Sequence, residues 1–100
     1  MKKFLVFLSL FASLNALALN CTVEDDKGCE NVSSTREYTE CMYKKIESLT
    51  PACKKVITIY QTCIGDIESL CRGVDSEHTT FACLIHNKDK LNDMCKAVTN

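Results

Sequence analysis

Glycine and proline are scarce in this sequence, with three and one among 100 residues. Folds made of strands and tight turns normally need more of both, because turn positions require the backbone conformations that these residues supply. An alternation of apolar and polar residues over more than a few positions is also lacking. These absences argue against an all-β fold and predict an all-α one.

An excess of positive charge is missing as well. The chain carries 12 basic and 13 acidic side chains, a net charge of −1. Without a basic patch, nucleic acid and anionic membranes are not expected as partners. Neither a G-x-S-x-G nor a C-x-x-C motif occurs, so no activated nucleophile is predicted. We therefore expect no enzymatic activity and no cofactor.

The one sustained apolar run lies at the start of the chain. Two lysines precede an apolar stretch at residues 4–14, and a small-residue cleavage motif ends at Ala18. This arrangement predicts a secretory signal peptide at residues 1–18 and a domain at residues 19–100. A membrane anchor would need about 20 apolar residues. Secretion is therefore expected, or export to the periplasm if the source is a Gram-negative bacterium.

Cysteine is abundant, with eight residues that form two sets of identical spacing, C-x7-C-x11-C-x11-C, displaced by 42 positions. The first set is Cys21, Cys29, Cys41 and Cys53, and the second is Cys63, Cys71, Cys83 and Cys95. A strict period marks a repeated unit, placed at about residues 21–56 and 63–98. An even number of cysteines in a short exported chain predicts a disulfide framework. The alternative, a zinc site, lacks any C-x2-C or C-x4-C pair.

Capping residues and apolar spacing predict the helices. Thr50 is a suitable N-cap and Pro51 a suitable first residue for a long helix that ends near Gly73, a natural C-cap. Shorter helices are expected at about residues 34–48, 76–87 and 92–98. Ser34 aligns with Ser76 across the 42-residue period as a helix start, and Ser76 is followed by Thr79. Ile85 and Met94 are expected among the apolar residues of the last two helices. The segment from Cys21 to Cys29 has no apolar face, so its helix is expected to be short or irregular.

Helix geometry limits the disulfide pairing. Cys63 and Cys71 lie eight residues apart on one predicted helix, about 12 Å, whereas a disulfide needs Cα atoms within roughly 7 Å. Each cysteine must therefore reach another helix. A nested pattern is preferred, with pairs Cys71–Cys83, Cys63–Cys95, Cys29–Cys41 and Cys21–Cys53. A crossed pattern, Cys63 with Cys83 and Cys71 with Cys95, remains the alternative.

The second repeat carries a more specific pattern. It contains C-x2-D-I-x2-L-C from Cys63 and C-L-x2-N-x3-L-x3-C from Cys83. This pattern resembles the cysteine-rich repeat of Golgi apparatus protein 1, also called the cysteine-rich fibroblast growth factor receptor. The resemblance extends from Cys21 to Val98, although the first repeat keeps mainly the cysteine spacing. It implies disulfide-braced helical hairpins that bind proteins such as growth factors and adhesion receptors, and it assigns no ligand-binding residue here.

Two sequons fit N-glycosylation in a eukaryotic source, at Asn20 and Asn31. Asn31 is the better candidate because it falls in a predicted loop, whereas Asn20 adjoins a bridged cysteine.

The remaining polar candidates are interpreted as surface residues. His78 and His86 are eight positions apart, too far along a helix to share a metal ion. Asp66 is interpreted as a solvated or locally hydrogen-bonded helix residue. An acidic cluster near the start of the domain lacks the spacing of a calcium loop and is interpreted as a solvated face: Glu24, Asp25, Asp26 and Glu30. No metal site is predicted.

The sequence thus predicts a small, secreted, all-α domain of tandem disulfide-braced helical hairpins that acts as a non-catalytic protein-binding module. Its partner would be an extracellular or secretory-pathway protein. One alternative is a thiol-based metal-binding or redox protein of the periplasm or secretory lumen, which requires reduced cysteines. Another is a secreted effector or signalling peptide on the same scaffold. With only two repeats, the outer face of the last helix is a candidate surface for homodimer formation.

Overall fold

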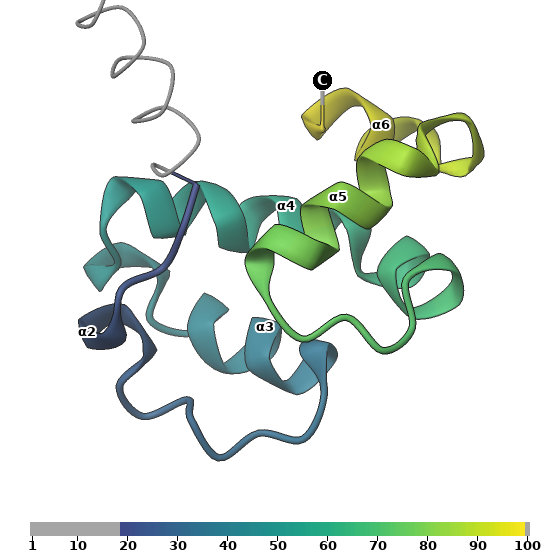
Figure 1. Cartoon of the computed structure of the whole chain (residues 1–100). Helices are drawn as coiled ribbons and strands as arrows, with labels where there is room; N and C mark the ends of the chain where they lie inside the picture. The colour runs from purple at the N-terminus through teal and green to yellow at the C-terminus, as the bar shows by residue number, and fades with distance from the viewer. Residues whose placement is uncertain (1–18, 100) are drawn as a thin grey trace, which may run out of the picture.

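The computed structural model describes residues 19–99, and the expected signal peptide lies outside them. Within this range the chain forms helices and no strand, which confirms the all-α prediction. The α-helices are α2 (Val23–Asp26), α3 (Thr35–Tyr43), α4 (Pro51–Leu70), α5 (Glu77–His86) and α6 (Asp93–Val98), as Figure 1 shows, and 3₁₀ helices occupy Ile46–Ser48 and Lys88–Lys90. None of the helices in the described range is long and apolar enough to cross a membrane.

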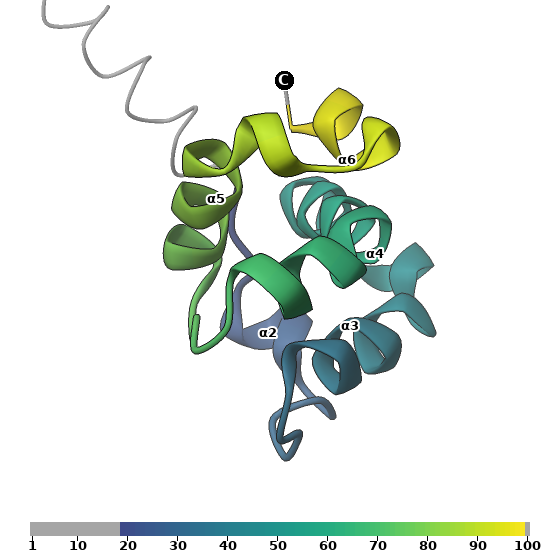
Figure 2. The same cartoon turned by 90° about the vertical axis from the view of Figure 1, so that its right-hand side faces the viewer.

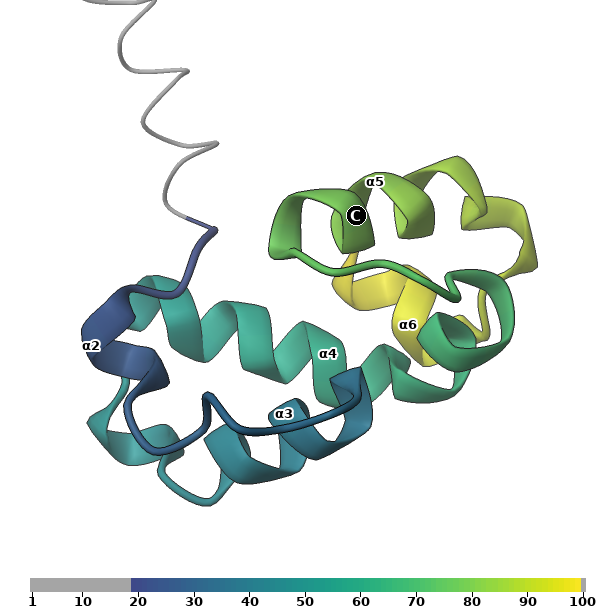
Figure 3. The ribbon, with the colours of Figure 1, turned by 60° about the horizontal axis from the view of Figure 1, so that its bottom comes forward.

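Helix α4 is the centre of the fold. It packs against α3, α5 and α6, and it lies between α2 and α3 on one side and α5 and α6 on the other (Figures 2 and 3). Thr50 is its N-cap and Pro51 occupies its first turn, as the sequence predicts. The helix ends at Leu70 with Cys71 as C-cap, two residues before the Gly73 that the sequence predicts for this role. Gly73 then adopts a φ of +83°, a conformation that favours glycine over other residues.

The 42-residue period of the sequence is also a period of the structure. Helices α3 and α5 begin 42 residues apart, as do α4 and α6, and the two 3₁₀ helices. Helix α2 is a short counterpart of the C-terminal part of α4. Helix α4 therefore serves both repeats: it is the last helix of the first repeat and the first helix of the second.

The sequence-based prediction for α3 was wrong at its C-terminal end. The helix stops at Tyr43 instead of reaching Ser48, and a 3₁₀ turn follows. This turn directs Leu49, which is 6% exposed, into the core immediately before α4 begins. A continuous helix would not make that reversal. In the second repeat, α5 ends at the matching place. There the side chain of its C-cap, Asn87, donates a hydrogen bond to the carbonyl of Cys83 (2.9 Å).

Buried side chains form one core around α4, among them Met42, Val56, Ile57, Ile67 and Leu84. Three aromatic rings connect the repeats within it. The rings of Tyr38 and Phe81 meet Tyr60 edge to face, at centroid distances of 6.4 and 5.8 Å. Since these rings come from α3, α5 and α4, the two repeats share one packed interior.

Two apolar side chains expected on helix stripes lie instead on the surface. Ile85 of α5 is 63% exposed and Met94 of α6 is 72% exposed. Each is next to a residue that turns inward, Leu84 and Cys95 respectively, and both of those are fully buried. A short helix has only one face toward the core, so its neighbouring position points outward.

Candidate functional site

All eight predicted disulfide cysteines are paired in the structure, and no free cysteine occurs in residues 19–99. The pairs are Cys21–Cys53, Cys29–Cys41, Cys63–Cys95 and Cys71–Cys83. This is the nested pattern in both repeats, and the crossed alternative is wrong. The bridges join α4 to α6 directly and its C-cap to α5, and they tie the segments on either side of α2 to α4 and α3.

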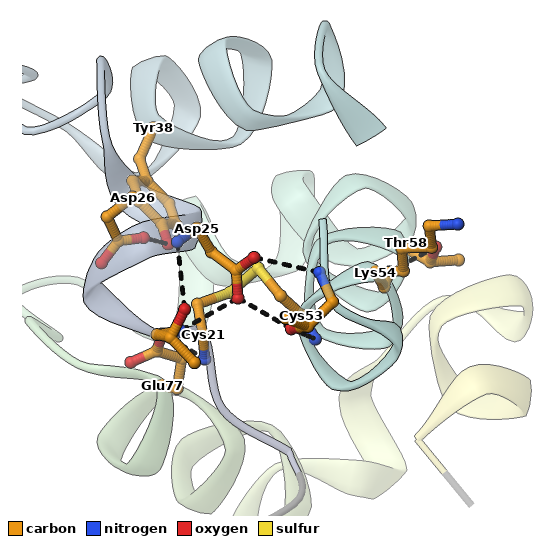
Figure 4. The surroundings of a disulfide bond; sticks show 10 residues. Cys21, Asp25, Asp26, Tyr38, Cys53, Lys54, Thr58 and Glu77 are labelled. Carbon is orange, nitrogen blue, oxygen red and sulfur yellow. Dashed lines mark hydrogen bonds between the residues drawn. A yellow bond between two sulfur atoms is a disulfide. The ribbon is translucent and has the colours of Figure 1, made fainter. Parts of the chain in front are cut away.

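Asp25 corrects the prediction that the acidic cluster is a solvated face. Its side chain is only 5% exposed and accepts three hydrogen bonds, from the N–H of Thr22 (3.0 Å) and from the N–H and hydroxyl of Thr50 (3.0 and 2.7 Å). The same Thr50 hydroxyl accepts from the N–H of Cys53 at 3.4 Å. Asp25 therefore orients the N-cap of α4, beside the Cys21–Cys53 bridge (Figure 4).

Burial alone would raise the pKa of Asp25, but the hydrogen bonds from Thr22 and Thr50 outweigh that effect and lower the pKa from 3.8 to about 2. Asp25 is therefore held as a carboxylate by donors that stabilise its charged form.

Asp66 performs the same task in the second repeat although it is only partly buried, so the prediction is wrong where it expected a local hydrogen bond. Its carboxylate accepts from the N–H and the side-chain amide of Asn92, both at 2.9 Å. Asn92 in turn is the N-cap of α6 and accepts from the N–H of Cys95 (2.9 Å). In both repeats an aspartate thus fixes the cap residue from which the last helix begins. Asp25 and Asp66 are structural residues and are not free to bind a ligand.

A hollow of about 400 Å³ lies where the two repeats meet, and we call it the inter-repeat hollow. Its walls include the segments that lead into α3 and α5, at residues 32–35 and 74–77. Tyr60 of α4, which is 3% exposed, contributes to its lining. Asp26 and Tyr38 complete the wall on the side of the first repeat, where the Tyr38 hydroxyl donates to Asp26 at 2.6 Å.

Charged groups in the inter-repeat hollow are all acidic. Asp26, Asp75 and Glu77 line it, and no lysine, arginine or histidine does. Within residues 19–99, none of these three carboxylates takes part in an ion pair. Glu77 lies close to the N-terminal segment, where it accepts a long hydrogen bond from the N–H of Cys21 (3.4 Å; Figure 4).

A second hollow of about 530 Å³ adjoins the first, and we call it the apolar hollow. Leu19, Phe81, Ala82 and Ile85 give it a largely hydrocarbon lining. Ser76 and Glu77 belong to both hollows, so the first turn of α5 separates an acidic site from an apolar one.

Protein-family models, curated proteins and solved structures offer no match to this chain. Its function is therefore argued from its own residues. The two adjoining hollows are the candidate functional site.

The sequence did not indicate this site. Its walls come from five separate segments, and their serine, threonine and aspartate residues also fit ordinary helix caps and loops. The nearest signal was the pair of aligned N-caps, Ser34 and Ser76, which predicts two helix starts but does not place them beside each other.

The other predicted candidates stay apart from the hollows, with one exception. His86 is exposed on α5 and lines neither hollow, whereas the exposed His78 is one of the residues that line the apolar hollow. In residues 19–99, no group of three or more histidine, cysteine or acidic side chains is arranged to hold a metal ion.

Asn31 is exposed in the loop before α3, and its neighbours Val32 and Ser33 line the inter-repeat hollow. Thr22 of the other sequon is engaged as the N-cap of α2. We expect expression through a eukaryotic secretory pathway to attach one glycan, at Asn31. Treatment with peptide N-glycosidase should then increase the gel mobility of the wild type and of Asn20→Gln, but not of Asn31→Gln. Unchanged glycosylation of Asn31→Gln would show that this assignment is wrong.

Proposed function

We propose that this domain is a secreted, non-catalytic protein-binding module that engages its partner at the two adjoining hollows. The observation that carries the proposal is their position: an acidic hollow and an apolar hollow share a wall at the junction of two covalently braced repeats. Concave sites with an apolar part and a few polar groups are typical places for binding.

The disulfides support this proposal because they limit motion of the walls. Cys71–Cys83 fixes α5 to the end of α4, and Cys29–Cys41 fixes the loop before α3 to that helix. A site that is already rigid loses less conformational entropy when it binds. Four disulfides also fit an oxidising extracellular or secretory environment.

The resemblance to the cysteine-rich repeat of Golgi apparatus protein 1 agrees with a binding role, as an analogy at the level of the repeat. The thiol-based alternative would first require reduction, since all eight cysteines are paired. An effector or signalling role would use the same surface and differ only in its partner.

A selection of displayed random peptides on the immobilised, oxidised protein tests the proposal. We expect enrichment of peptides that bind at the hollows. Replacing Ile85 by Ser should weaken them about tenfold, the loss expected when an aliphatic contact worth about 1.4 kcal/mol is removed. Affinities are measured by titration calorimetry.

The matched control is Met94→Ser, which removes a similarly exposed apolar side chain outside both hollows. It should leave the affinity within about twofold, a change below 0.5 kcal/mol. The absence of any enriched peptide, or equal losses in the two variants, would refute binding at this surface.

A further inference from the structure

The proposed function leaves the chemistry of the partner open, and the two hollows restrict it. We propose that the partner segment is a peptide with a lysine or arginine beside an aliphatic residue. The basic side chain occupies the inter-repeat hollow, and the aliphatic side chain occupies the apolar hollow. This inference rests on the proposed function and adds the partner's chemistry to it.

The charge of the inter-repeat hollow selects a cation. Asp26, Asp75 and Glu77 contribute three carboxylates, and within residues 19–99 no basic side chain pairs with them. Helices α3 and α5 also begin at this hollow, but each helix N-terminus contributes only about half a positive charge. The carboxylates therefore outweigh both helix ends, so an anion is disfavoured and a cation is attracted.

The pKa values of two tyrosines at the same place are raised, mainly by burial and in part by this negative charge. Burial is the largest cause that raises the pKa of Tyr60, to about 12, and the charge of Glu77 adds to it, while a hydrogen bond with Thr80 opposes it. The pKa of Tyr38 is raised by burial first and then by its hydrogen bond to Asp26, with further contributions from the charges of Asp26 and Glu77. Nearby carboxylates thus contribute to the raised pKa of one tyrosine on α3 and of one on α4.

The lining also provides hydrogen-bond acceptors for the N–H groups of a basic side chain. Lysine and arginine carry only hydrogen-bond donors, and the hollow offers carboxylates together with the hydroxyls of Ser33 and Thr35 as acceptors. The half-buried ring of Tyr38 offers a face for a cation–π contact.

The shared wall indicates that the two side chains of the ligand are adjacent. Ser76 and Glu77 line both hollows, so a ligand that fills one is brought next to the other. Phe81 and Ile85 then provide an aliphatic and aromatic surface for the residue beside the basic one. A peptide that carries only one of the two features would use half of the site.

Backbone amide shifts of the exported, oxidised protein, measured by NMR, test this inference with three probes. These are N-acetylated dipeptide amides that contain leucine with lysine, with norleucine or with glutamate. The lysine probe should shift amides at residues 32–38 and 74–80, and bind about fivefold or more tightly than the uncharged norleucine probe, a difference of about 1 kcal/mol. Its affinity should fall as salt is added.

Asp75→Asn is the test variant, because Asp75 is exposed in the loop before α5 and its replacement should not disturb the core. It should lower the affinity for the lysine probe about threefold or more. The control variant Asp89→Asn, which replaces an exposed acid outside both hollows, should leave that affinity unchanged. Thermal melts of both variants check that the fold is kept.

Equal binding of the lysine and norleucine probes, preference for glutamate, or no shift with any probe would overturn the inference. The peptide selection distinguishes these results from failure of the proposed function. Enriched peptides without basic residues would retain the binding module and reject its predicted partner chemistry, whereas a selection without any enriched peptide would reject the module itself.

Discussion

Replacing both cysteines of the Cys63–Cys95 pair by alanine is expected to lower the free energy of unfolding by about 4 kcal/mol. The bridge closes a chain separation of 32 residues, and the entropy that a disulfide removes from the unfolded chain grows with the length of that loop. The inner Cys71–Cys83 bridge closes only 12 residues, so its removal should cost about 3 kcal/mol. Urea denaturation of the two double variants measures both values.

The first repeat provides an internal control, because its bridges have the same separations of 32 and 12 residues. Removing the Cys21–Cys53 bridge should again lower the free energy of unfolding more than removing the Cys29–Cys41 bridge. Because these contributions together are comparable to the whole stability of a small domain, full reduction is expected to unfold the protein, with loss of helical circular dichroism. A reduced protein that kept its helices and cooperative melting would contradict this expectation.

Asp25→Ala is expected to be the most damaging single replacement of a polar residue, at about 3 kcal/mol. The variant would leave the N–H groups of Thr22 and Thr50 without their acceptor in a buried site, and each such loss is costly. Asp66→Ala should cost less, about 1 kcal/mol, because Asp66 is less buried and water can replace it. Urea denaturation measures both, and equal losses would argue against burial as the cause.

The lowered pKa of Asp25 also predicts how stability depends on pH. Because the folded-state pKa, about 2, lies below the ordinary value of 3.8, the carboxylate contributes its full stabilisation above about pH 4. That contribution is lost as the pH falls from 4 to 2. The melting temperature of the wild type should therefore fall more steeply over this interval than that of Asp25→Asn. Parallel curves would show that another group controls acid unfolding.

Local patterns predicted most of the fold. Thr50 with Pro51, and Ser76 with Thr79, are helix-start signals that act within a few residues, and the structure keeps both. Helix geometry excluded disulfide pairing along one helix, but it left both the nested and the crossed pattern possible. The structure selects the nested one. The end of α3 was missed because the requirement to bury Leu49 arises only when α4 is in place.

The two aspartates show why aligning the repeats did not predict hydrogen bonds between residues far apart in the sequence. Asp25 bonds to a residue 25 positions later, and Asp66 to one 26 positions later. A shift of 42 residues therefore aligns Asp25 with Ile67 and not with Asp66. Two residues with the same role differ by one position in the repeat, so the alignment concealed their equivalence. The hollows could not be predicted from the sequence for a related reason: their walls combine segments of both repeats that are far apart along the chain.

Because both repeats use α4, the number of inter-repeat hollows in a chain depends on the number of repeats. The inter-repeat hollow exists only where one repeat passes into the next, so an array of this kind has one fewer such site than it has repeats. The two repeats described here meet once. A monovalent module of this type would occupy a partner and mask its surface, whereas longer arrays would be able to cross-link several partners.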